Sequence, residues 1–305
     1  MKLHPQVVAL LEVAAGFPSL SEGSVETARS RVARIRDLIG PGPDIAEVAD
    51  IELATPLGRL PARRYTPDDP APGAIVWFHG GGWVTGRPAD YDAVCRTLAL
   101  HTGLPLVSVA YRRAPEEPFP AAADDGFAAL ASVAGELEAR APLIVGGDSA
   151  GGNLAAVATL RARDVGVPVA LQVLVNPVTD CNFATPSYGE YADVGLPLGR
   201  TEMEWFWDLY VPDAAERIHP FASPLRAASL EGVAPAHIVV AEHDVLRDEA
   251  LRYAERLDAA GVAVDVRRYD DVTHGFFSYV GYLDRAGEAV AEAAEAIDRT
   301  RRTTA

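Results

Sequence analysis

The sequence predicts an α/β protein built on a mostly parallel β-sheet with helices on both faces. From about residue 50 onward, short runs rich in β-branched residues alternate with longer stretches of helical periodicity. This alternation is typical of parallel strands that are connected by helices. With 305 residues, 49% of them hydrophobic, the chain is long enough for one large domain, with or without a smaller appendage.

The individual elements follow from the length and period of the apolar runs. Short apolar runs bounded by glycine, proline or polar residues predict strands, and longer runs with a period near 3.6 predict helices. The expected strands are residues 51–56, 59–65, 74–78, 105–110, 143–146, 171–176, 237–241 and 264–269. The expected helices are residues 90–101, 121–139, 150–163, 201–210, 247–260 and 283–299.

Two stretches, residues 1–45 and 180–225, do not follow the strand–helix alternation. The second is rich in aromatic residues and begins just after a predicted strand, where the ligand-binding loops of such sheets lie. We therefore expect the two stretches to form one cap over a catalytic domain made of residues 46–179 and 226–305. A simpler alternative for Trp205, Phe206 and Tyr210 is that they form the buried face of one helix.

Composition excludes several classes of partner. The formal net charge of −16 argues against nucleic acid or an anionic membrane, because both need a basic surface. Cys95 and Cys181 have neither metal-ligand spacing nor the pattern of a disulfide framework, so a reducing compartment is expected. The N-terminal apolar run is interrupted by polar residues, and no later run is long enough to span a bilayer. These observations predict a soluble, cytoplasmic protein without a metal.

A glycine-bracketed serine at residues 147–151, Gly-Asp-Ser-Ala-Gly, predicts a nucleophile. The apolar run 142–146 leads into it and a helical pattern follows, which is the strand–turn–helix context that a nucleophile elbow requires. Glycine is needed on both sides because a side chain there would collide with neighbouring backbone. The alternative is an ordinary serine N-cap between a strand and a helix. In the elbow, Ser149 would stand at the positive end of a helix, which favours a nearby oxyanion.

A serine hydroxyl needs a base, and the base needs an acid that orients it. In this type of fold the chain order is serine, acid, histidine. Of the histidines after Ser149, His274 follows a late strand and has Asp244 before it at the end of another strand. Asp180 and Glu242 are rival acids. His274 could instead be a solvated loop histidine, and His243 is expected to be structural because it precedes the acid.

The run His-Gly-Gly-Gly-Trp at residues 79–83 follows a buried strand and predicts an oxyanion loop. Consecutive glycines let backbone N–H groups approach a bound carbonyl without a Cβ in the way. The alternative is a glycine-rich turn that only closes the strand. A nucleotide phosphate loop is excluded because its Lys-Ser/Thr ending is missing. We expect His79 to fix the loop through hydrogen bonds, and Asp148 to support it as well.

Over about residues 50–300, the chain resembles the hormone-sensitive-lipase-like, or bacterial family IV, esterases of the α/β-hydrolase superfamily. The resemblance rests on residues 79–83, 111–116, 119–125, 147–152, 244–249 and 274–276, which occur in the family's order. It implies an eight-stranded, mostly parallel sheet with a small helical cap, and a triad of Ser149, Asp244 and His274. It also implies an oxyanion hole made by the N–H groups of Gly81, Gly82 and Ala150. Arg113, Glu117 and Val245 depart from the family pattern.

The resulting hypothesis is a carboxylesterase that hydrolyses short-to-medium acyl esters through an acyl-enzyme and uses no metal or organic cofactor. One alternative is an amidase or acetyl-hydrolase of a specific metabolite, which would share these motifs. Another is a non-catalytic small-molecule receptor, but the plant hormone receptors that resemble this fold lack the catalytic histidine. The expected partner is a small-molecule ester, and the resemblance is compatible with a homodimer through an edge strand and a late helix.

Overall fold

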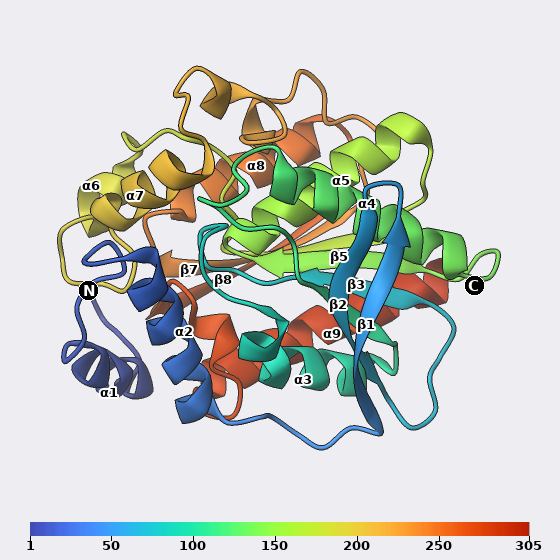
Figure 1. The fold of residues 1–305 in the computed structure, drawn as a ribbon, viewed down its shortest axis with the longest axis horizontal. Helices are drawn as coiled ribbons and strands as arrows, with labels where there is room; N and C mark the ends of the chain where they lie inside the picture. Colours follow the sequence, from blue (N-terminus) through green and yellow to red (C-terminus); the bar gives the residue numbers. More distant parts are fainter. Residues whose placement is uncertain (305) are drawn as a thin grey trace.

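A computed structural model describes residues 1–304, apart from the side chains at positions 36, 38, 303 and 304. In this part of the chain, eight strands form one sheet in the order β1-β2-β4-β3-β5-β6-β7-β8 (Figure 1). The strands are β1 (Glu47–Thr55), β2 (Gly58–Thr66), β3 (Ala74–Phe78), β4 (Leu106–Val109), β5 (Leu143–Asp148), β6 (Leu171–Val175), β7 (Ala236–His243) and β8 (Val264–Thr273).

The sheet is mostly parallel, as expected. Strand β2 pairs antiparallel with both β1 and β4, and every pairing from β4 through β3 to β8 is parallel. Each of the eight expected strands is present, although β7 and β8 run two and four residues further than predicted. Because the parallel strands all point the same way, the residues that follow β3, β5, β7 and β8 emerge at one edge of the sheet.

Helices cover both faces of the sheet. On one face lie α3 (Asp92–Thr102) and α9 (Asp284–Thr304), and on the other lie α4 (Ala121–Glu136), α5 (Ala150–Val165) and α8 (Arg247–Ala259) (Figure 1). Side chains of β3 alternate between two separate apolar clusters, because successive residues of a strand point to opposite faces. Ile75 and Trp77 join the α3–α9 cluster, whereas Val76 and Phe78 join the other.

The two stretches outside the alternation are helical and lie on the same side of the molecule. They contain α1 (Pro5–Ala14) and α2 (Val25–Ile39) at the N-terminus, and α6 (Pro186–Tyr191) and α7 (Arg200–Tyr210) after β6 (Figure 1). Short 3₁₀ turns complete the fold at Pro88–Tyr91, Glu216–Ile218, Pro224–Arg226 and Phe276–Ser278. Among the described helices, none has both the length and the apolar character that a membrane crossing requires.

Arg29 of α2 ties the N-terminal helices to the loop after β3. Its Nε donates to the Val84 carbonyl at 2.9 Å, and Nη2 donates to the Ala114 carbonyl at 3.1 Å. The same guanidinium forms a two-pronged ion pair with Glu116, with both contacts at 2.7 Å. The Arg29 side chain is largely shielded from solvent, while the Glu116 side chain is 60% exposed. Water therefore weakens the ion pair with Glu116 more than it weakens the hydrogen bonds to the two carbonyls.

We predict that Arg29→Leu destabilises the protein by about 1 to 3 kcal/mol, because two backbone carbonyls lose a charged donor. Glu116→Gln is the control. It removes only the exposed ion pair, and should cost less than about 1 kcal/mol. Chemical denaturation of both variants measures the two free energies of unfolding. Equal losses would mean that the carbonyl bonds contribute nothing.

Candidate active site

Ser149 stands on a sharp turn between β5 and α5. Its backbone has φ 56° and ψ −119°, a conformation that costs of order 1–3 kcal/mol for a residue with a Cβ. The turn is held from both sides, because Ser149 N–H donates to the Val175 carbonyl at 2.8 Å and its own carbonyl accepts from Asn153 N–H at 3.0 Å. The side chain is therefore fixed at the first turn of α5, with Ser149 8% exposed.

The glycines on either side of the serine are required by close backbone packing, as the sequence predicted. A Cβ on Gly147 would lie 2.5 Å from the Gly151 carbonyl carbon and oxygen. A Cβ on Gly151 would overlap the Phe78 carbonyl oxygen at the end of β3. The start of α5 thus packs directly on the backbone of β3. An ordinary serine N-cap does not need such close packing, so this contact favours the nucleophile elbow over the N-cap.

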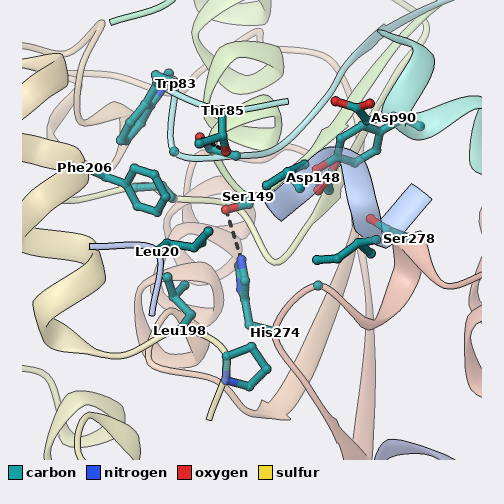
Figure 2. Close-up of a pocket in the computed structure, with 18 of the residues that line it drawn as sticks. Leu20, Trp83, Thr85, Asp90, Asp148, Ser149, Leu198, Phe206, His274 and Ser278 are labelled. Atoms are coloured by element: carbon teal, nitrogen blue, oxygen red, sulfur yellow. Dashed lines mark hydrogen bonds between the residues drawn. The ribbon is translucent and has the colours of Figure 1, made fainter. Parts of the chain in front are cut away.

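Ser149, His274 and Asp244 come together at the carboxyl edge of the sheet. Ser149 Oγ lies 3.1 Å from His274 Nε2, and His274 Nδ1 lies 2.7 Å from Asp244 Oδ2 (Figure 2). Asp244 and His274 directly follow β7 and β8. Leu246 N–H donates to the other Asp244 oxygen at 3.0 Å, which fixes the carboxylate.

The rival acids are engaged elsewhere. Asp180 pairs with Arg226, whose Nε donates to it at 2.5 Å. Glu242 accepts hydrogen bonds from Arg247 and Arg268. Neither carboxylate has a hydrogen bond to His274 among the described residues.

The electrostatics of the site centre on His274. Burial lowers the pKa of the imidazole, but the Asp244 carboxylate and, to a lesser degree, Asp148 raise it, and the net pKa lies above the ordinary value of 6.5. Burial raises the pKa of Asp148 to about 7, although His274 and the Gly80 N–H both favour its charged form. His274 and Asp148 therefore affect each other's pKa, because each stabilises the charged form of the other, and their protonation is coupled.

The loop after β3 presents backbone N–H groups beside Ser149. Among the described residues, no hydrogen bond is donated by the N–H of Gly81, Gly82 or Ala150. Gly82 has φ 59°, and a Cβ there would overlap the ring of Phe206 in α7. Only glycine at position 82 therefore lets the loop lie this close to the aromatic ring. The N–H groups of Gly81, Gly82 and Ala150 are available to an oxyanion because they donate to no other group in the described part of the chain.

His79 and Asp148 both contact this loop. The buried His79 ring donates from Nδ1 to the Gly80 carbonyl at 2.8 Å, and burial lowers its pKa to about 4, so the ring is neutral at pH 7. Asp148 Oδ1 accepts from Gly80 N–H at 3.0 Å. The Tyr111 ring stacks on His79, with centroids 4.4 Å apart, and its hydroxyl donates to the His79 carbonyl at 2.8 Å.

A cavity of about 150 Å³ opens over Ser149 and His274. Both stretches outside the alternation line it: Leu20, Val32, Ile35 and Ile39 come from the N-terminus, and Pro197, Leu198, Met203 and Phe206 from the segment after β6. Figure 2 shows Leu20, Leu198, Phe206 and Trp83 on one side of Ser149, with Asp90 and Ser278 on the other. The pocket is thus apolar on the side of Leu20, Leu198, Phe206 and Trp83, and more polar on the side of Asp90 and Ser278.

Sequence reasoning missed several residues that hold the site. Arg113, one of the departures from the family pattern, donates to the Gly86 carbonyl at 2.7 Å. Asn153 donates to the Val178 carbonyl at 2.9 Å, and buried Glu249 accepts from Thr179 N–H at 2.7 Å. The sequence marks residues 111–116 and 244–249 as motifs. The contacts of Arg113 with Gly86 and of Glu249 with Thr179 appear only in the folded chain, because these partners are far apart in the sequence.

In residues 1–304, no group of three or more histidine, cysteine, aspartate or glutamate side chains is arranged to hold a metal ion.

Comparison with known proteins agrees with this geometry. The chain is 42% identical to carboxylic ester hydrolase LipN of Mycobacterium tuberculosis, over 78% of this chain and 66% of LipN. It is 35% identical to ethyl acetate hydrolase of Pseudomonas putida, over 98% of this chain and 99% of that protein. Its structure superposes on the hyperthermophilic esterase of Pyrobaculum calidifontis with a TM-score of 0.92 and 35% identity, over 100% of both chains.

A family match covers two thirds of the chain and the whole site region except for the N-terminal helices. The matching residues are 75–278, and the family is described by the alpha/beta hydrolase fold. This span begins in β3 and ends just after His274, so it includes the glycine loop, Ser149 and Asp244. The chain therefore belongs to the family of proteins with the alpha/beta hydrolase fold.

Proposed function

We propose that this protein is a carboxylic ester hydrolase of the hormone-sensitive-lipase-like group, acting on short-to-medium acyl esters. The observation that carries the proposal is the line of hydrogen bonds from Asp244 through His274 to Ser149, at 2.7 and 3.1 Å. The similarity to a carboxylic ester hydrolase and an ethyl acetate hydrolase supports the ester as substrate class.

In the first half of the proposed reaction, Ser149 Oγ attacks the ester carbonyl while His274 Nε2 takes the hydroxyl proton. The carbonyl oxygen becomes an oxyanion, which the N–H groups of Gly81, Gly82 and Ala150 stabilise. Asp244 holds the imidazole by its Nδ1–H and stabilises the imidazolium. When the carbon–oxygen bond to the alcohol breaks, His274 gives its proton to the departing oxygen and leaves an acyl group on Ser149.

In the second half, water replaces the alcohol. His274 takes a proton from the water, whose oxygen adds to the acyl carbon, and the same N–H groups stabilise the second oxyanion. The bond from the acyl carbon to Ser149 Oγ then breaks, and Oγ recovers the proton from His274. The products are one carboxylic acid and one alcohol, with the enzyme unchanged.

Both alternatives lead to distinct experiments. An amidase or acetyl-hydrolase of a specific metabolite would use the same residues, so turnover of matched ester and amide substrates separates it from an esterase. A receptor has no need of a base, and the contact between His274 and Ser149 favours an enzyme. The cytoplasmic location and the homodimer stay predictions from the sequence.

We further propose that residues 1–45 and 180–225 form one cap over a catalytic domain of residues 46–179 and 226–305. Support comes from the cavity, because side chains of both segments line it around Ser149. A hydrogen bond from Ser21 Oγ to Glu202 at 3.2 Å links the two segments directly. A cap of this kind excludes water and shapes the pocket, while the chemistry stays with the sheet.

Replacing the nucleophile provides the main test. Ser149→Ala should lower kcat toward ethyl acetate by roughly 10³-fold or more and abolish covalent labelling by a fluorophosphonate, because the attacking oxygen is gone. Ser278→Ala is the matched control, since Ser278 also lines the pocket. It should keep the label and most of the activity. Mass spectrometry locates the label, and a label on any residue but Ser149 would contradict the proposal.

The acid is tested by its effect on rate and on pH dependence. His274 must be neutral to act as base, so kcat/KM should rise with pH through a pKa above 6.5, the side to which Asp244 shifts it. Asp244→Asn should lower kcat roughly 10⁴-fold and move the residual rising limb to lower pH, because the carboxylate that raised the pKa is removed. Asp180→Asn, whose carboxylate pairs with Arg226, should change neither. A larger loss of kcat for Asp180→Asn than for Asp244→Asn would mean that Asp180, and not Asp244, orients His274.

The cap is tested at Phe206, which lines the cavity against Gly82. Phe206→Ala should raise kcat/KM for esters of bulky, branched acids relative to acetate by several-fold, because the removed ring frees space beside Ser149. Trp205→Ala removes the neighbouring ring of the same helix, which does not line this cavity. That variant should keep the wild-type preference. An unchanged preference in both variants would show that α7 does not shape the pocket.

A further inference from the structure

A second apolar cavity lies next to the active-site pocket, beneath the N-terminal helices. It measures about 90 Å³ and is mostly apolar. Side chains of α1 and α2 line it, among them Leu10, Ala14 and Arg31, together with Thr273, His274 and Phe276. None of the buried polar side-chain atoms that lack a hydrogen-bond partner, among the described residues, belongs to its lining. A cavity of this character favours an apolar occupant over water.

The second cavity and the active-site pocket share one wall. Leu20, Val32, Ile35, Pro197, His274 and Tyr279 line both spaces. The three aliphatic side chains at positions 20, 32 and 35 come from the N-terminal segment. Rotamer changes of such side chains are fast, so they can open a passage without movement of the sheet.

A third small space continues the row to the surface. It measures about 40 Å³, shares Leu10, Ala14, Arg31, Ile35 and Tyr279 with the second cavity, and adds Val13, Phe17 and Arg34. Val13 is 48% exposed and Phe17 is 37% exposed. The three cavities thus follow one another from Ser149, between α1 and α2, to the outside of the protein, where Val13 and Phe17 lie beside the exposed Arg34.

We propose that these three cavities form a tunnel for an unbranched alkyl chain of the ester. The inference rests on the proposed function and extends it, because it gives the N-terminal helices a binding role and allows a longer linear substrate than the active-site pocket alone. An alkyl chain fits because most of the lining side chains are aliphatic or aromatic, with Arg31, Arg34 and Thr273 as polar exceptions, and burial of each methylene against apolar side chains is favourable. The chain can belong to the acid or to the alcohol of the ester, since both meet at Ser149.

Ala14 is the position at which the tunnel is best blocked. It is the last residue of α1 and lines both the second and the third cavity. Ala14→Trp would fill the passage with an indole ring, and Ala14→Leu would fill part of it. Val8→Trp is the matched control, because Val8 lies on the same helix, is 42% exposed and lines none of the three cavities.

The experiment measures kcat/KM by pH-stat titration for two series, the ethyl esters from acetate to decanoate and the acetates from ethyl to decyl. In the series whose alkyl chain enters the tunnel, Ala14→Trp should lower kcat/KM for the longest esters roughly tenfold or more and leave kcat/KM for ethyl acetate at the wild-type level. Val8→Trp should keep the wild-type kcat/KM for every ester of both series. Ala14→Leu should move the cutoff less, and it replaces Ala14→Trp if that variant fails to fold. Wild-type profiles for both Ala14 variants in both series would overturn the tunnel, whereas absence of wild-type turnover on ethyl acetate would overturn the proposed function instead.

Discussion

The close packing of the start of α5 on the end of β3 is the constraint on which the site depends. Gly151 touches the Phe78 carbonyl so closely that no Cβ fits between them. This contact forces the sharp turn at Ser149 and, through Phe78, fixes where the glycine loop begins. The nucleophile and the backbone donors are therefore positioned by one contact between two parallel strands and a helix, and the rest of the sheet supports that contact.

Buried charge is the second constraint, and it is shared among several groups. Asp244 is almost fully buried and is stabilised by Leu246 N–H and by His274. Asp148 is buried too, but it supports the glycine loop and faces the same imidazole. Because an unpaired buried charge is costly, both carboxylates lie near the imidazole, and both raise the pKa of His274 against the effect of its burial.

The N-terminal helices belong to the site even though they precede the sheet in sequence. Arg29 binds the Val84 carbonyl, which lies two residues after Gly82 in the glycine loop. Leu20 and Ile35 line the cavity over Ser149. The same segment therefore lines the pocket and binds the glycine loop, so loss of the whole segment would affect both. The sequence indicates the first role, since residues 1–45 are expected in the cap, but it does not indicate the second.

The sequence by itself determined the sheet and its eight strands, and it singled out Ser149, His274 and Asp244 as the proposed triad, because short apolar runs, glycine spacing and chain order can be read along the chain. It also indicated that residues 1–45 and 180–225 lie outside the sheet, but not that Ser21 would bond to Glu202 or that Arg29 would reach Val84. Those contacts join residues 55 to 181 positions apart. Only the tertiary structure decided them, together with the cavities between α1 and α2, because the shape of a cavity depends on how side chains from distant segments fill space and no local pattern records it.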